Sequence, residues 1–274
     1  MIKVILIVLV ILALVIYFSI SIAKNLKTEM NSVQIDVDDP DVSPVSMKVA
    51  VIGDIHLREG EDITKFLKLL DEVKSNSPDL VLLVGDYITG IRRIKNIDSH
   101  RRSIIRTFKS LDPIPRAVVL GNHDNFTGRE KWFSEFKRLG VDVLENETRI
   151  MNIADVEVCI RGLGDYRSHR FRFVDYPAEC KNLPKITITH DPQGAFESGV
   201  EGLVFAGHTH CGQVSFPIIG PLKVPTKAPR AAICGLYKDS KRTLFVTSGV
   251  GTSIIPIRYG AQSQWDLIDL SFMN

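Results

Sequence analysis

An amide, an imidazole and a carboxylate follow one another in Asn122-His123-Asp124, directly after Gly121. The apolar run 117–120 precedes them and predicts a short buried strand. In an open α/β sheet, ligands bind in the crevice outside the carboxyl ends of the strands. By itself this stretch fits two interpretations equally well. It is either a polar turn that caps the next helix or part of a metal site, because Asp, Asn and His side chains bind divalent metals.

The same kind of ending follows four other apolar runs, and this recurrence favours the metal site. Each run is short and buried in character, and each ends in Asp or His, usually after a glycine. The endings are Asp54 and His56 after 49–52, Asp86 after 80–84, His190 after 186–189, and His208 and His210 after 203–206.

Such a set of side chains is suited to hold divalent metal ions, and one reaction that a pair of such ions can catalyse is phosphoryl transfer. In extended backbone, residues i and i+2 face the same side, so Asp54 is expected to act with His56, and His208 with His210. Two divalent ions about 3.5–4 Å apart can clamp the attacking and leaving oxygens of an in-line displacement. A carboxylate can bridge two such ions, and a hydroxide shared by both would be the nucleophile.

The elements that must position these residues alternate early in the chain and become strand-rich later. Strands are predicted at 48–53, 80–84, 117–120, 186–190, 202–206, 243–248 and around 264–270, with antiparallel strands at 141–144, 148–153 and 156–160. Helices are predicted at 61–75, 98–110 and 129–139. This order predicts an α/β fold in which two packed sheets carry helices on the outside, in one domain over residues 47–274.

Composition sets limits on the partners and on the compartment. The net charge of +2 over 274 residues gives no reason to expect a nucleic-acid partner. The four cysteines have no CxxC spacing, which argues against a zinc-thiolate site. Reduced thiols in a cytosolic setting are the simpler interpretation, although an even number also allows disulfides. Cys211 directly follows the histidine pair but is not predicted to be a metal ligand.

The N-terminus predicts a membrane anchor over residues 1–24. Residues 4–23 carry no charge and are about as long as a helix that crosses a bilayer. A cleaved signal peptide is the alternative, but its apolar region would be unusually long. The lysines on the two flanks nearly balance, so they do not fix the orientation; the cytoplasmic face of the cell membrane is preferred for the catalytic domain. Residues 25–46 are polar and acidic and predict a tether.

Taken in order, the blocks Asp54-x-His56, Gly85-Asp86, 121–124, His190 and 207–210 resemble the calcineurin-like metallophosphoesterases. The resemblance covers nearly all of residues 48–250. The anchor and the segment 208–214 are similar to the membrane-anchored branch of that family. Cys211 is a departure, because relatives in this branch usually carry glycine there.

The resemblance implies a four-layer αββα sandwich of two mixed sheets and a centre of two divalent metal ions. Metal one would take Asp54, His56, Asp86 and His210, and metal two would take Asp86, Asn122, His190 and His208. A mixed Asp, Asn and His set admits manganese, iron, zinc or cobalt. In that family, the histidine that matches His123 protonates the leaving oxygen or stabilises the phosphoryl oxygens. Asp124 is expected to orient that ring by accepting a hydrogen bond.

The function that follows is a membrane-anchored, metal-dependent hydrolase of a phosphodiester or diphosphate bond. The anchored branch points to a lipid substrate of the UDP-2,3-diacylglucosamine type, from lipid A biosynthesis, with the bilayer as partner. A phosphodiesterase acting on phospholipid, cell-wall or nucleotide substrates is the alternative within the enzyme class. A different class of function is a non-catalytic, membrane-tethered scaffold, but the complete ligand set argues against it. A secreted nuclease is a further alternative, but this sequence lacks an evident basic-aromatic groove of the kind that binds single strands.

Overall fold

Two mixed β-sheets form the centre of the computed structural model, which describes residues 12, 17–22, 24–60, 63–90 and 94–273. The first sheet has the order β1-β13-β2-β3-β4, in which β2, β3 and β4 are parallel and β13 runs antiparallel to β2. Its strands are β1 (Glu29–Asp38), β13 (Gln264–Met273), β2 (Val45–Ile52), β3 (Leu80–Leu83) and β4 (Arg116–Val118).

The second sheet has the order β11-β12-β8-β7-β6-β5, with a parallel centre and antiparallel edges. Its strands are β11 (Gly235–Lys238), β12 (Arg242–Val246), β8 (Gly202–Ala206), β7 (Lys185–Ile188), β6 (Val156–Gly162) and β5 (Glu147–Ile153). Apolar side chains of both sheets, such as Val51 and Leu82 from the first and Ile188 and Phe205 from the second, share one buried core. The two sheets therefore pack face to face.

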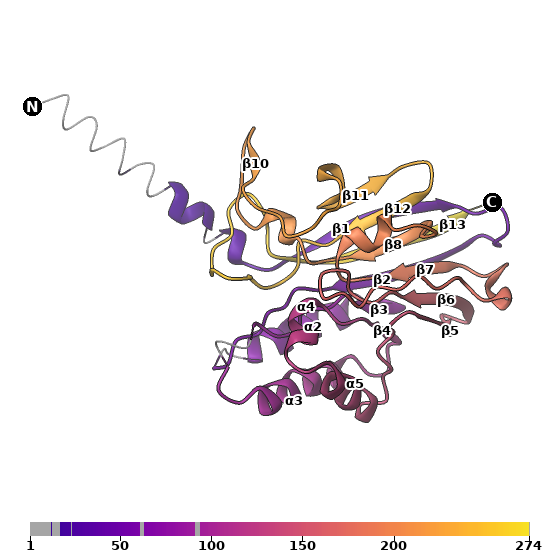
Figure 1. Cartoon of the computed structure of the whole chain (residues 1–274), viewed down its shortest axis with the longest axis horizontal. Coiled ribbons are helices and arrows are strands. Elements are labelled where there is room, and N and C mark those ends of the chain that lie inside the picture. Colours follow the sequence, from indigo (N-terminus) through magenta and orange to yellow (C-terminus); the bar gives the residue numbers. More distant parts are fainter. Residues whose placement is uncertain (1–11, 13–16, 23, 61–62, 91–93, 274) are drawn as a thin grey trace, which may run out of the picture.

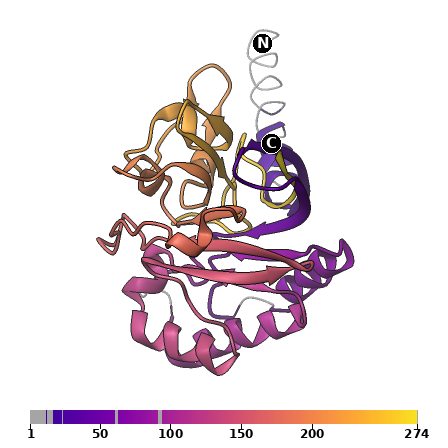
Figure 2. The same ribbon diagram turned by 90° about the vertical axis from the view of Figure 1, so that its right-hand side faces the viewer.

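Three amphipathic helices cover the other face of the first sheet, as the sequence predicts. They are α2 (Ile63–Ser75), α3 (Ile97–Thr107) and α5 (Arg129–Arg138), and Figures 1 and 2 show them together on one side of the molecule. Their buried faces supply Phe66, Leu70, Ile104 and Trp132 to a second core. A short helix, α4 (Asn122–Phe126), links β4 to α5.

The outer face of the second sheet differs from the predicted αββα arrangement. Side chains such as Leu244 and Val204 pack there against the irregular segment 163–200, and no α-helix covers them in the described part of the chain. Apart from β7 itself, which belongs to the sheet, that segment contains only the short 3₁₀ turns Ala178–Cys180 and Pro192–Phe196. Pro177, Pro184 and Pro192 interrupt it, and proline cannot donate the backbone hydrogen bonds of a helix interior.

Most predicted strands are confirmed to within a few residues, and the predicted strand at 141–144 is not. That segment makes only the single bridge between Val118 and Val143. Three short strands went unpredicted in the second half of the chain. They are β11 and the two strands of a hairpin, β9 (Ser215–Phe216) and β10 (Gly220–Pro221).

The polar segment predicted as a tether at 25–46 contains β1, which pairs in parallel with β13 along its whole length. Val33, Ile35 and Val37 alternate there with polar residues, and Ile35 is fully buried in the core between the sheets. This period of two is the pattern of a strand with one buried face. The acidic residues on its other face conceal that pattern in the sequence.

The predicted membrane anchor lies largely outside the described residues. Within 1–24, the described residues are 12, 17–22 and 24, and residues 17–22 and 24–26 are helical. Among the described residues, no helix combines the length and apolar character needed to span a bilayer.

All four cysteines are paired, which corrects the prediction of reduced thiols. Cys159 of β6 is bonded to Cys180, and Cys211 is bonded to Cys234. The paired residues lie 21 and 23 positions apart. Spacing of that kind carries no signal for a disulfide in the sequence, because the fold alone brings the partners together.

We expect Ile35→Ala to lower the free energy of unfolding by about 2–5 kcal/mol, because the change removes a buried side chain from the core between the sheets. Gln34→Ala, on the exposed face of the same strand, is the matched control and should change stability by less than about 0.5 kcal/mol. Denaturant unfolding of the full chain in detergent measures both. Equal stability of the two variants would mean that β1 is not part of the folded core.

Candidate metal centre

Acidic and histidine side chains converge where the carboxyl ends of both sheets meet. Asp54 follows β2, Asp86 follows β3 and Asn122 begins α4 after β4. The second sheet contributes His190 after β7, and His208 and His210 after β8. The strand-end placement predicted from the sequence is therefore present, and the two sheets direct these residues toward one another.

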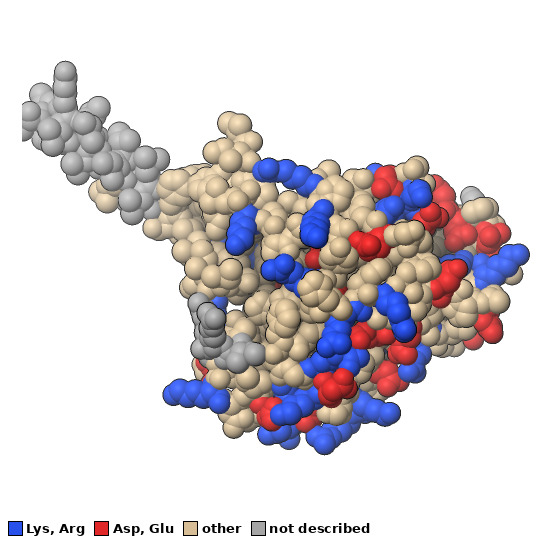
Figure 3. Space-filling model, viewed as in Figure 1, with Lys and Arg blue, Asp and Glu red and all other residues tan. Residues whose placement is uncertain are grey.

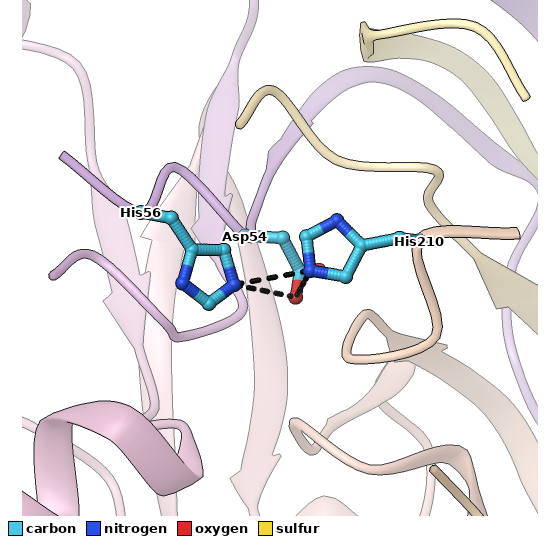
Figure 4. Close-up of side chains that lie close together, drawn as sticks. All are labelled: Asp54, His56 and His210. Carbon is cyan, nitrogen blue, oxygen red and sulfur yellow. Dashed lines mark hydrogen bonds and ion pairs between the residues drawn. The ribbon is translucent and has the colours of Figure 1, made fainter. Parts of the chain in front are cut away.

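The first group of donor atoms consists of Asp54, His56 and His210 (Figure 4). The two Nε2 atoms of the histidines lie 3.0 Å apart. Oδ1 of Asp54 lies 3.4 Å from Nε2 of His210 and 3.9 Å from Nε2 of His56. Donor atoms at such separations match ligands arranged around one ion with bonds of about 2.0–2.2 Å.

The second group consists of Asp86, His190 and His208. Oδ2 of Asp86 lies 3.2 Å from Nε2 of His190, and that nitrogen lies 3.2 Å from Nδ1 of His208. The same Asp86 oxygen lies 3.5 Å from Nε2 of His56, which belongs to the first group. One carboxylate oxygen therefore faces both sets of donors.

Each carboxylate uses one oxygen to fix its orientation and directs the other into the cluster. Asp54 accepts the backbone N–H of His208 on Oδ2 at 2.8 Å, and Asp86 accepts the N–H of His123 on Oδ1 at 2.8 Å. Oδ1 of Asp54 and Oδ1 of Asn122 are buried and have no hydrogen-bond partner among the described residues. Unpartnered buried oxygens are costly in a folded protein, and divalent cations bound there would satisfy them. The residues present therefore fit a metal centre.

Hydrogen bonds behind the second group set which imidazole nitrogen faces the cluster. The Nδ1–H of His190 donates to the carbonyl of Val84 at 2.7 Å, and the Nε2–H of His208 donates to the carbonyl of Pro225 at 3.0 Å. The remaining lone pairs, on Nε2 of His190 and Nδ1 of His208, then point toward Asp86. This is the usual arrangement around metal-binding histidines.

Burial lowers the pKa values of three imidazoles at the centre, whereas His190 differs: burial opposes its charged form, but the carboxylate of Asp86 raises its pKa well above the usual value. Burial lowers the pKa of His56 to about 3, and it also lowers the pKa values of His208 and His210. Burial raises the pKa of Asp54 to about 7. Asp86 differs: burial opposes its ionisation, but the imidazoles of His190 and its neighbours hold its pKa well below the usual range. Neutral imidazoles and an ionised carboxylate are the forms that bind divalent metals.

The backbone at these positions is in a conformation that few residues other than glycine adopt. Asp54, His56, Asp86, His208 and His210 all have positive φ values, between 47° and 70°. Such residues are uncommon and collect at functional sites, where the surrounding fold enforces the strain. The glycines beside them allow close approach. A Cβ on Gly121 would lie 2.2 Å from Oδ1 of Asp86, and one on Gly207 would lie 2.4 Å from Oδ2 of Asp54.

His123 and Asp124 do not interact as the sequence predicts. Asp124 is fully buried and accepts the backbone N–H groups of Gly121, Asp86 and Tyr87 at 2.7–3.0 Å. Both of its oxygens are thus used to join the loops after β3 and β4. The ring of His123 lies against that of His56, with 4.7 Å between centroids, and its Nδ1 has no hydrogen-bond partner in the described part of the chain.

Two further buried groups at the centre were missed. Asp165 is 1 % exposed, and its Oδ1 has no hydrogen-bond partner in the described ranges. Its signal was available, because Gly164-Asp165 follows β6 just as Gly85-Asp86 follows β3. The guanidinium of Arg258 lies 3.1 Å from Nδ1 of His210 and donates to the carbonyls of Ser248, Gly249 and Gly251. No local pattern marks that arginine.

The disulfide at Cys211 explains why this chain departs from the glycine expected there. Cys211 has a φ of 51°, a conformation that glycine adopts without strain. Its bond to Cys234 ties the segment that follows His210 to the segment before β11. A covalent link therefore holds a backbone position that glycine would otherwise favour.

Comparison with known proteins agrees with this geometry. The model of the calcineurin-like phosphoesterase family matches residues 47–212. An uncharacterized metallophosphoesterase of Campylobacter jejuni is 31% identical over 262 residues, which cover 91% of this chain and 65% of that protein. Phosphodiesterase YaeI of Escherichia coli is 25% identical over 229 residues, covering 81% and 82%.

A zebrafish (Danio rerio) protein named transmembrane protein with metallophosphoesterase domain is 26% identical over 250 residues. The match covers 85% of this chain and 55% of the zebrafish protein, so the chain spans about half the length of that relative. The family model matches well over half of the chain and includes the strand-end residues from Asp54 to His210. The chain belongs to the calcineurin-like phosphoesterase family.

Proposed function

We propose that this phosphoesterase uses two divalent metal ions to hydrolyse a phosphodiester or diphosphate bond in a membrane-associated substrate. The observation that carries the proposal is the position of Asp86, whose Oδ2 lies 3.5 Å from a nitrogen of one donor group and 3.2 Å from a nitrogen of the other. Asp54, His56 and His210 would hold the first ion with Asp86. Asn122, His190 and His208 would hold the second with the same carboxylate.

Two ions bound there would polarise the phosphoryl group and activate water, and the choice among manganese, iron, zinc and cobalt stays open to metal analysis. The chain's own contribution is the fixed placement of the donors. Buried hydrogen bonds orient Asp54 and Asp86 through one oxygen each and orient His190 and His208 through the ring nitrogen that faces away from the cluster. Little rearrangement would then be needed during the reaction.

His123 is the proposed proton donor to the leaving oxygen, or the group that stabilises the phosphoryl oxygens. Three features support this role. Its ring borders His56, its Nδ1 has no hydrogen-bond partner within the described ranges, and it is only partly buried beside otherwise buried neighbours. Its backbone N–H donates to Asp86, and its ring lies close enough to His56 and Asp86 for the three side chains to form a further group of possible ligands, so metal content must be measured in any variant of His123.

A membrane-associated substrate is supported by the uncharged apolar segment 4–23 and by relatives named as transmembrane proteins. The UDP-2,3-diacylglucosamine type of lipid is the specific candidate if the catalytic domain faces the cytoplasm, and phospholipid, cell-wall and nucleotide phosphodiesters are the alternatives. Profiling lipids and nucleotides in cells that carry either the native chain or Asp86→Ala distinguishes these substrates. The accumulated compound would contain the bond that the enzyme cleaves.

We further propose that the catalytic domain lies on the oxidising side of the cell membrane, in place of the cytoplasmic face preferred from the sequence. The two disulfides support this assignment. Disulfides persist in oxidising compartments and are rare in the cytosol, where thiols are kept reduced.

Asp86→Ala should reduce hydrolysis of bis(4-nitrophenyl) phosphate to background and should lower the bound metal more than Asp54→Ala does. Asp86 is assigned to both ions and Asp54 to one, so the two variants form a matched pair. Metal analysis and activity of the purified proteins measure both effects. Two full equivalents of metal in Asp86→Ala would exclude the bridging role, and a native chain without metal-dependent hydrolysis would favour a scaffold.

His123→Ala should keep its metal content while kcat falls about 10²–10⁴-fold on phosphodiesters with alkoxide leaving groups. The loss should be much smaller with nitrophenolate, which leaves without a proton, if proton donation is the role. A uniform loss across leaving groups would indicate stabilisation of the phosphoryl oxygens instead. His169→Ala, at an exposed histidine, is the control and should leave kcat unchanged. Loss of metal in His123→Ala would assign His123 to the ligands.

Protease added to spheroplasts should digest the catalytic domain while a cytoplasmic marker protein stays intact. Residues 47–274 would be exposed to the outside if the disulfides reflect their compartment. Immunoblotting against a C-terminal tag follows the digestion, and detergent lysis gives the full-digestion reference. If the tag is protected until lysis, the catalytic domain lies on the cytoplasmic face.

A further inference from the structure

Six large aliphatic side chains are exposed at one end of the domain, here called the apolar end: Ile218, Ile219, Leu222, Ile254, Ile255 and Ile257. Ile218, at the turn between β9 and β10, is fully exposed, and Ile254 is 69% exposed. Single exposed apolar residues are ordinary on a protein surface, but a group of them marks an interaction site.

The two projections that carry these residues are fixed to each other. The side chain of Gln213 accepts the backbone N–H of Ser253 at 2.8 Å and donates to the carbonyl of Ile255 at 3.0 Å. Arg230 donates to the carbonyl of Ile219 at 2.8 Å, which supports the β9–β10 turn. The apolar end is therefore a built surface in which the hairpin and the loop 253–257 are joined.

The same end receives the N-terminal segment. The ring of Phe18 lies 5.2 Å from that of Tyr259, and Tyr259 lies 5.1 Å from Phe216 of β9. In Figure 1 the hairpin with β10 and residues 17–22 and 24–26 project from the same end, and Figure 2 shows both at the top of the molecule. The described residues 17–22 of the uncharged run therefore lie at the same end as the exposed isoleucines.

Charge at this end fits a lipid surface. Lys223, Lys227 and Arg230 are exposed and follow directly after the hairpin. In Figure 3 the tip of this end is free of charged side chains, basic side chains lie behind it, and the acidic ones on this face gather mostly toward the opposite end. An apolar tip with basic residues set back from it matches the layering of acyl chains and anionic headgroups.

We propose that the apolar end inserts into the bilayer interface beside the N-terminal segment and sets the metal centre at the level of lipid headgroups. This rests on the proposed function, because it requires the N-terminal segment to be in the membrane. The connection to the centre is short: Gln213 lies three residues after His210, and Arg258, which contacts His210, follows Ile257. Insertion of the apolar end would therefore bring the phosphate groups of membrane lipids within reach of the metal centre as substrates.

The test uses the full chain reconstituted into phosphatidylethanolamine and phosphatidylglycerol vesicles with brominated acyl chains. Ile218→Trp and Ile254→Trp should add blue-shifted tryptophan emission that the bromolipid quenches. Ile150→Trp, on β5 at the far edge of the second sheet, is the matched control. It replaces an isoleucine that is 42% exposed, and its emission should not be quenched. The native chain, with Trp132 and Trp265 buried, supplies the background.

Quenching at both positions of the apolar end, with none at the control, supports the proposal. Flotation with the vesicles but without such quenching would overturn the proposal while leaving the anchor intact. Self-association that Ile218→Asp abolishes would instead show that the apolar end binds a second copy of the chain. Loss of flotation would overturn the anchor and this proposal together. Hydrolysis of bis(4-nitrophenyl) phosphate by the same vesicles reports on the metal centre separately from all of these outcomes.

Discussion

The carboxylate of Asp86 is the constraint on which the rest of this structure depends. It is almost fully buried, between imidazoles from both sheets. A buried negative charge is stable only when hydrogen bonds and positive charge surround it. The backbone N–H of His123 supplies the hydrogen bond, and Asp124 holds the Asp86 backbone in place. The imidazole of His190 and its neighbours favour the ionised carboxylate, and divalent ions bound by the donor groups would add positive charge.

The position of Asp86 between its neighbours depends on the arrangement of both sheets. Asp86 can face His56 and His190 only if the carboxyl ends of β3, β2 and β7 meet, which the shared core between the sheets ensures. Five residues of the candidate centre, Asp86 included, have left-handed backbone conformations. A strand that ended one residue earlier would direct its side chain elsewhere. The large, well-packed core thus offsets local strain at the centre.

Local patterns were sufficient to predict which strand-end residues come together at the candidate centre, and most of the core elements. Strand-end Asp and His residues are visible because buried strands are short apolar runs, and α2 and α5 are visible from their spacing of apolar residues. What could not be predicted depends on contacts between distant segments. Asp124 was assigned to His123 because the two are adjacent, whereas its three partners are backbone amides, two of them from the loop after β3. The disulfide pairs and Arg258 likewise depend on the finished fold.

If the upstream segment is anchored in a membrane, the parallel pairing of β1 with β13 also limits how far the catalytic domain can move from it. A flexible tether of the 22 residues from 25 to 46 would give a reach of about 25 Å. In the structure, β1 begins at Glu29, three residues after the helical residues 24–26 end, so almost no slack lies between that helix and the sheet. With the upstream segment in a bilayer, the metal centre would keep a constant height above it. Such an enzyme meets its substrate by lateral diffusion in two dimensions, and compounds that stay far from the surface fall outside its range.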